Sequence, residues 1–109
     1  MMIIKISENG RVTLPAGNVL GYVGEHMLRV HKVIHPQVEN AMYTMLLVYD
    51  DDTEMTVNIN DGEMVMTCGL LSAEGVVKAQ FRATRNAGSV VHVLKSEVFT
   101  VKIMPSADV

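Results

Sequence analysis

The chain has 109 residues, 49% of them hydrophobic, and carries a formal net charge of −3 at pH 7. The hydrophobic content excludes a disordered chain, and the length fits one domain that buries its own core. Binding to nucleic acid requires clustered Lys and Arg, whereas the nine basic residues here are scattered, so we expect no nucleic-acid partner.

The first quarter of the chain predicts a short hairpin followed by a less regular segment. Residues 3–7 and 11–14 are joined by Asn9-Gly10, and Asn-Gly is one of the strongest local signals for a hairpin turn. A break rich in Pro and Gly follows at residues 15–18. Residues 19–23 then form either another short strand or a loop.

The middle of the chain predicts further strands separated by turns. The strands expected here are residues 26–34, 41–49, 54–60 and 63–68. Residues 41–49 are the most apolar of them, which favours a central place in a sheet. Pro36 marks a loop because proline cannot donate to a central ladder, and Asp50-Asp51-Asp52 and Asn60-Asp61-Gly62 carry turn chemistry.

The stretch from Gly75 to Met104 has the clearest pattern, and it predicts a strand, a turn, a second strand, a two-residue break and a third strand. Apolar side chains recur there at a period of two and so share one face: Val77, Ala79, Phe81, Ala83, Phe99, Val101 and Ile103. The turn is expected at residues 86–89, because Asn and Gly tolerate positive φ. Arg82 and Arg85, the nearest approach to a basic patch, are interpreted as a solvated strand end.

This spacing of short strands and turns predicts the fold class. We expect an all-β protein, an antiparallel β-sandwich of the immunoglobulin-like kind, with seven to nine short strands. One apolar face per strand is typical of a sheet that is covered by a second sheet. Residues 1–109 are interpreted as a single domain, in which residues 105–109 form a tail.

The N-terminal segment and the apolar runs bear on the cellular setting. The chain is charged within its first five residues and lacks a long apolar region there, so we expect no signal peptide. Its apolar runs are too short to span a bilayer, so we expect no transmembrane segment and no membrane partner. Cys68 is the only cysteine and cannot form an intrachain disulfide. Because Met64, Met66 and Cys68 share one face of a predicted strand, we expect Cys68 to be buried.

No catalytic, cofactor-binding or metal-binding residue is assigned, and we expect the chain not to be an enzyme, since no nucleophile with a paired base can be named. Asp50-Asp51-Asp52, Glu54 and Asp61 offer oxygen ligands of the kind that Ca²⁺ takes. No EF-hand pattern accompanies them, so a solvated turn is the preferred interpretation. The four histidines would form a metal site only if the fold gathered them, and each is expected to be an exposed strand residue: His26, His31, His35 and His92.

The order of features along most of the chain resembles a known family. The features are Gly24-Glu25 before an early strand, a strand ending in Tyr49-Asp50, a strand led by Gly62, Leu70-Leu71 before a strand that starts at Gly75 and contains Gln80-Phe81-Arg82, and the closing run from Lys95-Ser96 to Val101. They resemble the N-terminal β-sandwich modules of tail, baseplate and fibre-associated structural proteins in phages and prophages of Gram-positive bacteria, which often end in the pattern K-S-x-x-F-x-L-x-V. This chain matches the end of that pattern only approximately, because Thr100 and Val101 occupy the end of the pattern and Ile103 follows them.

The resemblance implies a non-enzymatic virion structural protein that docks or spaces other components in a symmetric assembly, without catalytic residues or a cofactor. The implied partners are other phage structural proteins or identical subunits, in a homo-oligomer, and the implied location is the virion tail, or the bacterial cytoplasm before assembly. Val65, Val90 and Val98, apolar at outward positions, are either interface residues or covered by a loop. The alternative function is a carbohydrate- or ligand-binding module, which needs exposed Tyr22 or Tyr43 beside polar groups.

Overall fold

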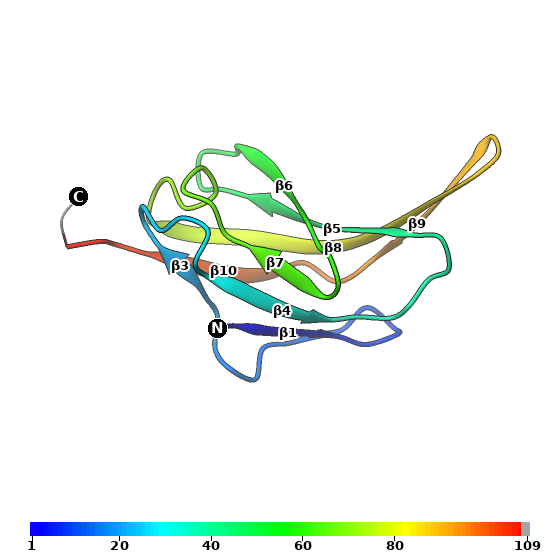
Figure 1. Cartoon of the computed structure of the whole chain (residues 1–109), viewed down its shortest axis with the longest axis horizontal. Helices are drawn as coiled ribbons and strands as arrows, with labels where there is room; N and C mark the ends of the chain where they lie inside the picture. Colours follow the sequence, from blue (N-terminus) through cyan, green and yellow to red (C-terminus); the bar gives the residue numbers. More distant parts are fainter. Residues whose placement is uncertain (108–109) are drawn as a thin grey trace.

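The computed structural model of the chain describes residues 1–107, which form ten β-strands (Figure 1). The strands are β1 (Ile3–Ile6), β2 (Val12–Thr13), β3 (Val19–Tyr22), β4 (Val30–Ile34), β5 (Met42–Val48), β6 (Glu54–Asn58), β7 (Glu63–Val65), β8 (Gly75–Ala87), β9 (Val90–Lys95) and β10 (Phe99–Met104). Within residues 1–107 no helix is long and apolar enough to cross a membrane. The predicted tail falls partly outside these residues, since residues 108–109 are not described.

The strands form two sheets that pack as a β-sandwich, which confirms the predicted all-β class, but the prediction of purely antiparallel sheets is wrong. One sheet has the order β2-β1-β4-β7, and the other has the order β3-β10-β8-β5-β6, with β9 also paired to β8. Both sheets are mixed, because β1 pairs in parallel with β4 and β10 pairs in parallel with β3. Parallel neighbours need a long connection between them, and the period of a strand does not reveal its neighbour. The ten strands exceed the predicted seven to nine because residues 19–23, for which a strand or a loop was expected, form the strand β3.

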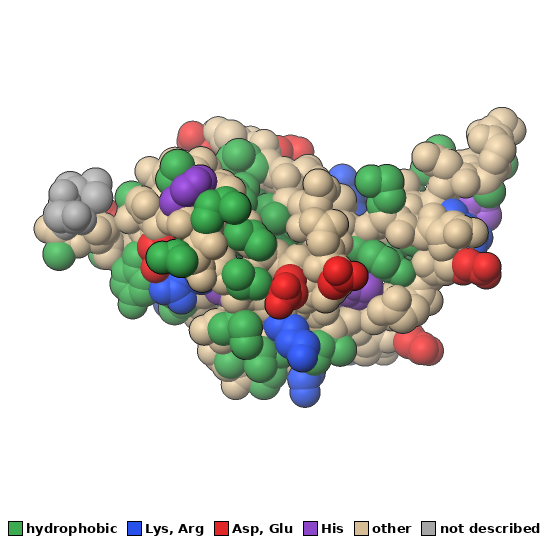
Figure 2. Space-filling model, viewed as in Figure 1, with side chains coloured by type: hydrophobic (Ala, Val, Ile, Leu, Met, Phe, Trp, Pro, Cys, Tyr) green, Lys and Arg blue, Asp and Glu red, His purple; other side chains and the backbone are tan. Residues whose placement is uncertain are grey.

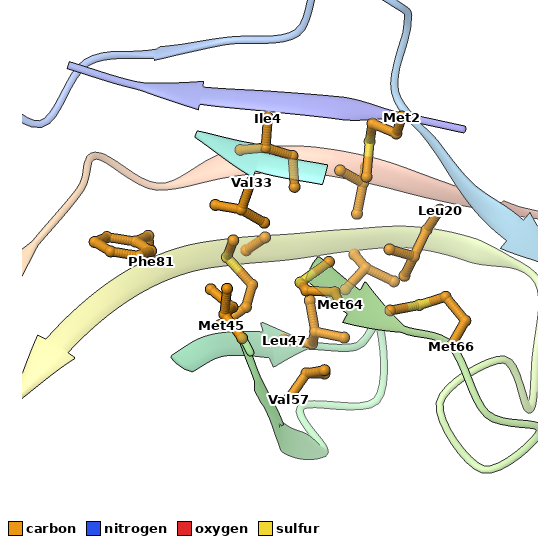
Figure 3. Close-up of a cluster of buried hydrophobic side chains, with 14 of the residues drawn as sticks. Met2, Ile4, Leu20, Val33, Met45, Leu47, Val57, Met64, Met66 and Phe81 are labelled. Atoms are coloured by element: carbon orange, nitrogen blue, oxygen red, sulfur yellow. The ribbon is translucent and has the colours of Figure 1, made fainter. Parts of the chain in front are cut away.

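The core lies between the two sheets and consists of side chains at alternate positions of the strands (Figure 3). The largest contributions come from Met2, Ile4, Leu20, Val33, Met45, Leu47, Met64, Met66 and Phe81, each at most 2% exposed. The predicted inward face of β8 is confirmed, since Val77, Ala79, Phe81 and Ala83 are all buried. Burying a side chain such as Leu47 contributes about 1.5–3 kcal/mol to folding.

Two short segments differ from the sequence prediction. The strand expected at residues 26–34 begins only at Val30, because Met27 has a φ of 65° and the chain turns there, leaving the Leu28 side chain 93% exposed. Cys68 is exposed rather than buried. The strand β7 ends at Val65, and residues 67–71 form a turn in which the Leu71 N–H donates to the Thr67 carbonyl (3.0 Å), so the strand alternation does not reach Cys68.

His31 also differs, because it is fully buried and not an exposed strand residue. Its Nδ1 accepts a hydrogen bond from the Met2 N–H (3.0 Å), and its Nε2–H donates to the Leu20 carbonyl. Burial lowers the pKa of His31 below its ordinary value of 6.5. The neutral ring therefore satisfies two backbone groups in the core and joins β4 of one sheet to β3 of the other.

A β-bulge separates β9 from β10, which follow one another along the same edge of β8. Between the pairs Arg82↔Lys95 and Ala79↔Phe99, two residues of β8 face three residues, 96–98, on the other side. The extra residue bends the strand and breaks the ladder locally. The predicted break between these two strands is confirmed, and it is one residue longer than expected.

At the bulge, the Ser96 side chain replaces a backbone group as the hydrogen-bond acceptor for β8. Its Oγ accepts a hydrogen bond from the Phe81 N–H (3.0 Å) and donates one to the Glu97 carbonyl (2.8 Å). The Ser96 carbonyl accepts from the Gln80 side-chain amide (2.9 Å). Ser96 is 5% exposed, so these bonds matter, because a buried N–H without an acceptor is costly.

Candidate functional site: a protein-docking surface

The clearest candidate site is a two-stranded extension of the larger sheet. The pairing of β5 with β8 ends at Met42↔Thr84, whereas β8 pairs with β9 from Arg82↔Lys95 to Ala87↔Val90. We call residues 82–95 the β8–β9 arm. Figure 1 shows the arm projecting from the body of the molecule, to the right. A two-stranded hairpin is marginally stable by itself in water, so a partner that covers the arm would stabilise it.

The tip of the arm is a tight hairpin turn. Ala87 pairs with Val90, which leaves the two-residue loop Gly88-Ser89. Gly88 has a φ of +65° and Ser89 does not have a positive φ, as in a type II′ turn. The predicted turn at residues 86–89 is confirmed at its second half, while Asn86 and Ala87 extend β8.

Apolar side chains are exposed on both faces of the arm. Directly opposite residues of an antiparallel pair lie on the same face, so Val91 and Val93, which pair with Asn86 and Thr84, share one face. Val90 and Leu94 lie on the other. The exposed fractions of these side chains are 55% for Val90, 59% for Val91, 51% for Val93 and 39% for Leu94.

The sequence of β9 carries the signal of a covered strand. Val90-Val91-His92-Val93-Leu94 does not alternate between apolar and polar residues. Near-continuous apolar runs are typical of strands that are buried on both faces. The described part of the chain covers neither face of this run.

The charges of the arm are of one sign. It contains Arg82, Arg85, Lys95 and His92 and has no Asp or Glu. The Nε atoms of Arg82 and Arg85 are covered and donate to no acceptor within residues 1–107, while Arg85 Nη2 lies 3.3 Å from His92 Nδ1. Figure 2 shows basic, histidine and hydrophobic side chains together at this end of the molecule. The acidic side chains beside them belong to other segments. The positive charge of the arm suits a partner surface that carries carboxylates.

The base of the arm is held by the turn between β1 and β2. The Glu97 N–H donates to the Gly10 carbonyl (2.8 Å), and the Glu97 carboxylate accepts from the Val12 N–H (2.8 Å). Gly10 has a φ of +83°, and a Cβ there would lie 3.2 Å from the Lys95 carbonyl oxygen. The bulge is thus clamped against the smaller sheet, which fixes the direction in which the arm projects.

The three valines predicted as interface residues lie on the surface, but on different elements. Their exposed fractions are 37% for Val65, 55% for Val90 and 58% for Val98. Val90 belongs to the arm, Val98 is presented by the bulge at its base, and Val65 lies on β7 of the other sheet. Burial under a loop, the other interpretation, does not occur for any of them. Their role in an interface stays a prediction.

A second candidate feature is an acidic cleft of about 280 Å³ at the opposite end of the molecule. Its wall is formed by apolar Tyr49, Met55, Ala73, Val76 and Val77 and by acidic Asp50, Asp51 and Glu74, and it contains no Lys or Arg among the described residues. Hydrogen bonds from the Thr53 side chain and from the Thr53 N–H (3.0 Å) lower the pKa of the Asp51 carboxyl. The cleft lies just under the usual size range of small-molecule pockets, about 300–1,000 Å³.

β8 connects the two features. It begins at Gly75 beside the cleft and ends at Ala87 at the arm tip, so its 13 residues span about 40 Å. The molecule is 49 Å long. Gly75 has a φ of 145°, which residues with a Cβ rarely adopt, and a Cβ there would also displace the Asp50 carboxylate, so glycine is favoured where the strand leaves the cleft.

The structure does not gather the residues considered for metal binding. Within residues 1–107 no group of three or more His, Cys, Asp or Glu side chains is placed to hold a metal ion. His31 is in the core, His35 stacks on Tyr43 with ring centroids 4.1 Å apart, and His26 accepts a hydrogen bond from the Cys68 N–H (3.0 Å). The prediction of exposed strand residues is also wrong for His26 and His35, because both lie outside the strands and His35 is half-buried. His92 lies on the arm.

Both tyrosines considered for carbohydrate binding contact neighbouring groups of the chain. The Tyr43 hydroxyl bonds with the Val38 backbone, accepting from its N–H (2.9 Å) and donating to its carbonyl (3.0 Å). Tyr22 is 43% exposed, but the Arg29 guanidinium lies 5.6 Å from its ring centroid and is held by Glu25 (2.7 Å). The Tyr43 hydroxyl is thus used within the chain, whereas the Tyr22 ring remains partly exposed beside Arg29 and Glu25.

Sequence reasoning missed the exposed residues Leu28, Val91, Val93 and Leu94 and the acidic cleft. The unbroken apolar run of β9 was the available signal for the arm. Nothing in the sequence indicated that Leu28 is exposed, because Leu28 fits the alternating pattern of a strand that does not form at that position.

Comparison with known proteins gives a similarity in fold. No protein-family model and no curated protein matches the sequence. Among solved structures, the chain is similar to the N-terminal domain of phage TP901-1 ORF48, with a TM-score of 0.54 and 14% sequence identity. The similarity covers 94% of this chain and 96% of that domain. The two chains share a fold over nearly their whole lengths.

Proposed function

We propose that this chain is a non-enzymatic structural module of a phage or prophage virion, which acts by binding other protein subunits of the tail, baseplate or fibre. The observation that carries the proposal is the fold similarity to the N-terminal domain of phage TP901-1 ORF48 over nearly all of both chains. The resemblance of the sequence to tail-associated modules of phages of Gram-positive bacteria points in the same direction.

The surface of the molecule fits an assembly role. The β8–β9 arm exposes Val90, Val91, Val93 and Leu94, and one edge of β9 has no neighbouring strand within residues 1–107. Exposed apolar surface and open strand edges are the means by which proteins of this kind join their neighbours. The carbohydrate-binding alternative has no support from the solved structure named above, and the Tyr43 hydroxyl is bonded to the Val38 backbone, which leaves Tyr22 as its one exposed tyrosine.

The test is whether the protein is part of a particle. Phage particles are purified from an induced culture of the source strain, and their proteins are identified by mass spectrometry. Antibodies against the folded chain, carrying gold, are then used to locate it by electron microscopy. We expect the chain at a fixed stoichiometry and the gold at the tail. Particles that lack the chain, from a strain that expresses it, would refute the proposal.

A further inference from the structure

We propose that the β8–β9 arm of one copy of this chain docks into the acidic cleft of a second copy, head to tail. The cleft is the one lined by Tyr49, Asp50, Asp51, Met55 and Glu74, together with its neighbours at the start of β8. The proposal names the partner for the assembly function above, and it rests on that function only for its biological setting.

The two surfaces are complementary in charge. The arm has Arg82, Arg85 and Lys95 and no carboxylate. The described cleft wall has three carboxylates and no Lys or Arg. Outside residues 75–96, the acidic residues outnumber the basic ones, so the arm is a basic extension of an acidic body. Such a distribution favours contact between unlike ends of two copies and disfavours contact between like ends.

The two surfaces also match in their apolar parts. The arm presents Val90 near its tip, with Val91 and Val93 on one face, and the cleft offers Tyr49, Met55 and other apolar wall residues. Docking would remove both sets from water, and it would bring the carboxylates of the cleft toward the positive charges of the arm.

The position of the two surfaces decides what kind of assembly forms. They lie at the two ends of β8, on a molecule 49 Å long, and they are different from one another. A contact between unlike surfaces is heterologous, so each copy keeps one free arm and one free cleft. Repetition of the contact produces a ring if the rotation closes and a filament if it does not.

The first measurement is the mass of the full chain in solution, by light scattering and sedimentation velocity over a wide concentration range. At about 0.1 M salt we expect the mass to rise with concentration, and at about 1 M salt we expect it to fall back, because screening is much stronger there. A protein that stays monomeric at all concentrations in low salt would overturn the proposal.

Two variants separate the arm from the cleft. Arg85→Glu alters the arm and leaves the cleft intact, and Glu74→Lys alters the cleft and leaves the arm intact. Each variant alone should lose self-association, with a dissociation constant raised at least about tenfold. Lys5→Glu, the same change of charge on the exposed face of β1, is the control and should associate as the wild type does.

Mixing the two variants tests the head-to-tail geometry. The intact arm of Glu74→Lys can enter the intact cleft of Arg85→Glu, so the mixture should associate although neither variant does so alone. No association in the mixture, or self-association of either variant at the wild-type strength, would refute the contact. Thermal melting checks each fold, and Val91→Asp replaces Arg85→Glu if the latter melts early.

The outcomes distinguish this inference from the function proposed above. A monomeric chain that is nonetheless found in purified particles refutes the second copy as partner and leaves the virion function standing. A chain that self-associates through arm and cleft but is absent from particles supports the docking and refutes the virion function.

Discussion

The Nε2–H of His31 donates to the carbonyl oxygen of Leu20 and so ties the two sheets of the sandwich together inside the core. His31 belongs to β4 of one sheet and Leu20 to β3 of the other, 11 residues earlier in the chain. On its other side the same ring accepts from the Met2 N–H. Both bonds require the neutral ring, because protonated Nδ1 cannot accept.

The buried histidine makes stability depend on pH. Burial depresses the pKa of His31 in the folded state below the ordinary value of 6.5, so below pH 6.5 the unfolded chain binds a proton that the folded chain does not. The His31 contribution is therefore complete above pH 6.5 and is lost as the pH falls toward the folded pKa, with a slope of at most about 1.4 kcal/mol per pH unit.

Urea denaturation between pH 8 and pH 5 measures this dependence. The wild type should lose free energy of unfolding below pH 6.5, and His31→Gln should show a shallower dependence. Ser89→Ala, at the exposed arm tip, changes no titratable group and is the control that should keep the wild-type slope. Equal slopes for His31→Gln and the wild type would contradict the assignment.

The second prediction concerns the bulge. Ser96→Ala removes the acceptor of the buried Phe81 N–H and should lower the free energy of unfolding by about 1–3 kcal/mol. Ser89→Ala, at the exposed arm tip, should change it by less than about 0.5 kcal/mol. Chemical denaturation compares the two variants. If Ser96→Ala left the free energy of unfolding unchanged, the Phe81 N–H would have to find another acceptor without the Ser96 side chain.

The period of two was enough to predict most strands and the inward face of β8, because alternate burial is local information. Val77, Ala79, Phe81 and Ala83 are buried as expected. The partners of the strands were not predictable in this way: the parallel pairing of β10 with β3 joins segments about 80 residues apart, and no local pattern records it.

The errors have the same origin. Leu28 and Cys68 fit an alternating pattern in the sequence, but the backbone leaves the strand at Met27 and after Val65, so their side chains reach water. His31 was expected to be exposed because histidine is polar, and its burial depends on the carbonyl of Leu20, a distant residue. The acidic cleft could not be predicted from the sequence for the same reason, since its wall combines the β5–β6 turn with the start of β8.

A matched pair of leucines tests where the core lies. Leu47→Ala, at a fully buried position, should cost about 2–5 kcal/mol. Leu28→Ala is the same substitution at a position that is 93% exposed, and it should cost less than about 0.5 kcal/mol. Urea titration of both variants gives the comparison. Similar losses would mean that Leu28 is covered in solution.

Glycine at the start of β8 is a further test. Gly75→Ala should destabilise the fold by more than about 1 kcal/mol and displace Asp50, because the new Cβ meets that carboxylate at a φ of 145°. Gly69→Ala is the control: its φ is not in the left-handed region, and the nearest atom to its Cβ would be Thr67 Oγ1 at 3.8 Å. It should be neutral or slightly stabilising. Thermal melts compare the two variants. A lower melting temperature for Gly69→Ala than for Gly75→Ala would contradict the need for glycine at position 75.

The last prediction concerns the single thiol. Cys68 is exposed, and its backbone N–H, not its sulfur, is used in the bond to His26. A coloured thiol reagent should therefore modify one cysteine per chain in the native protein, at a rate close to that in denaturant, because modification needs access to the sulfur. Cys68→Ser should abolish the reaction and leave the free energy of unfolding within about 0.5 kcal/mol of the wild type. Modification only after unfolding would place the thiol in the core, as the strand pattern alone had predicted.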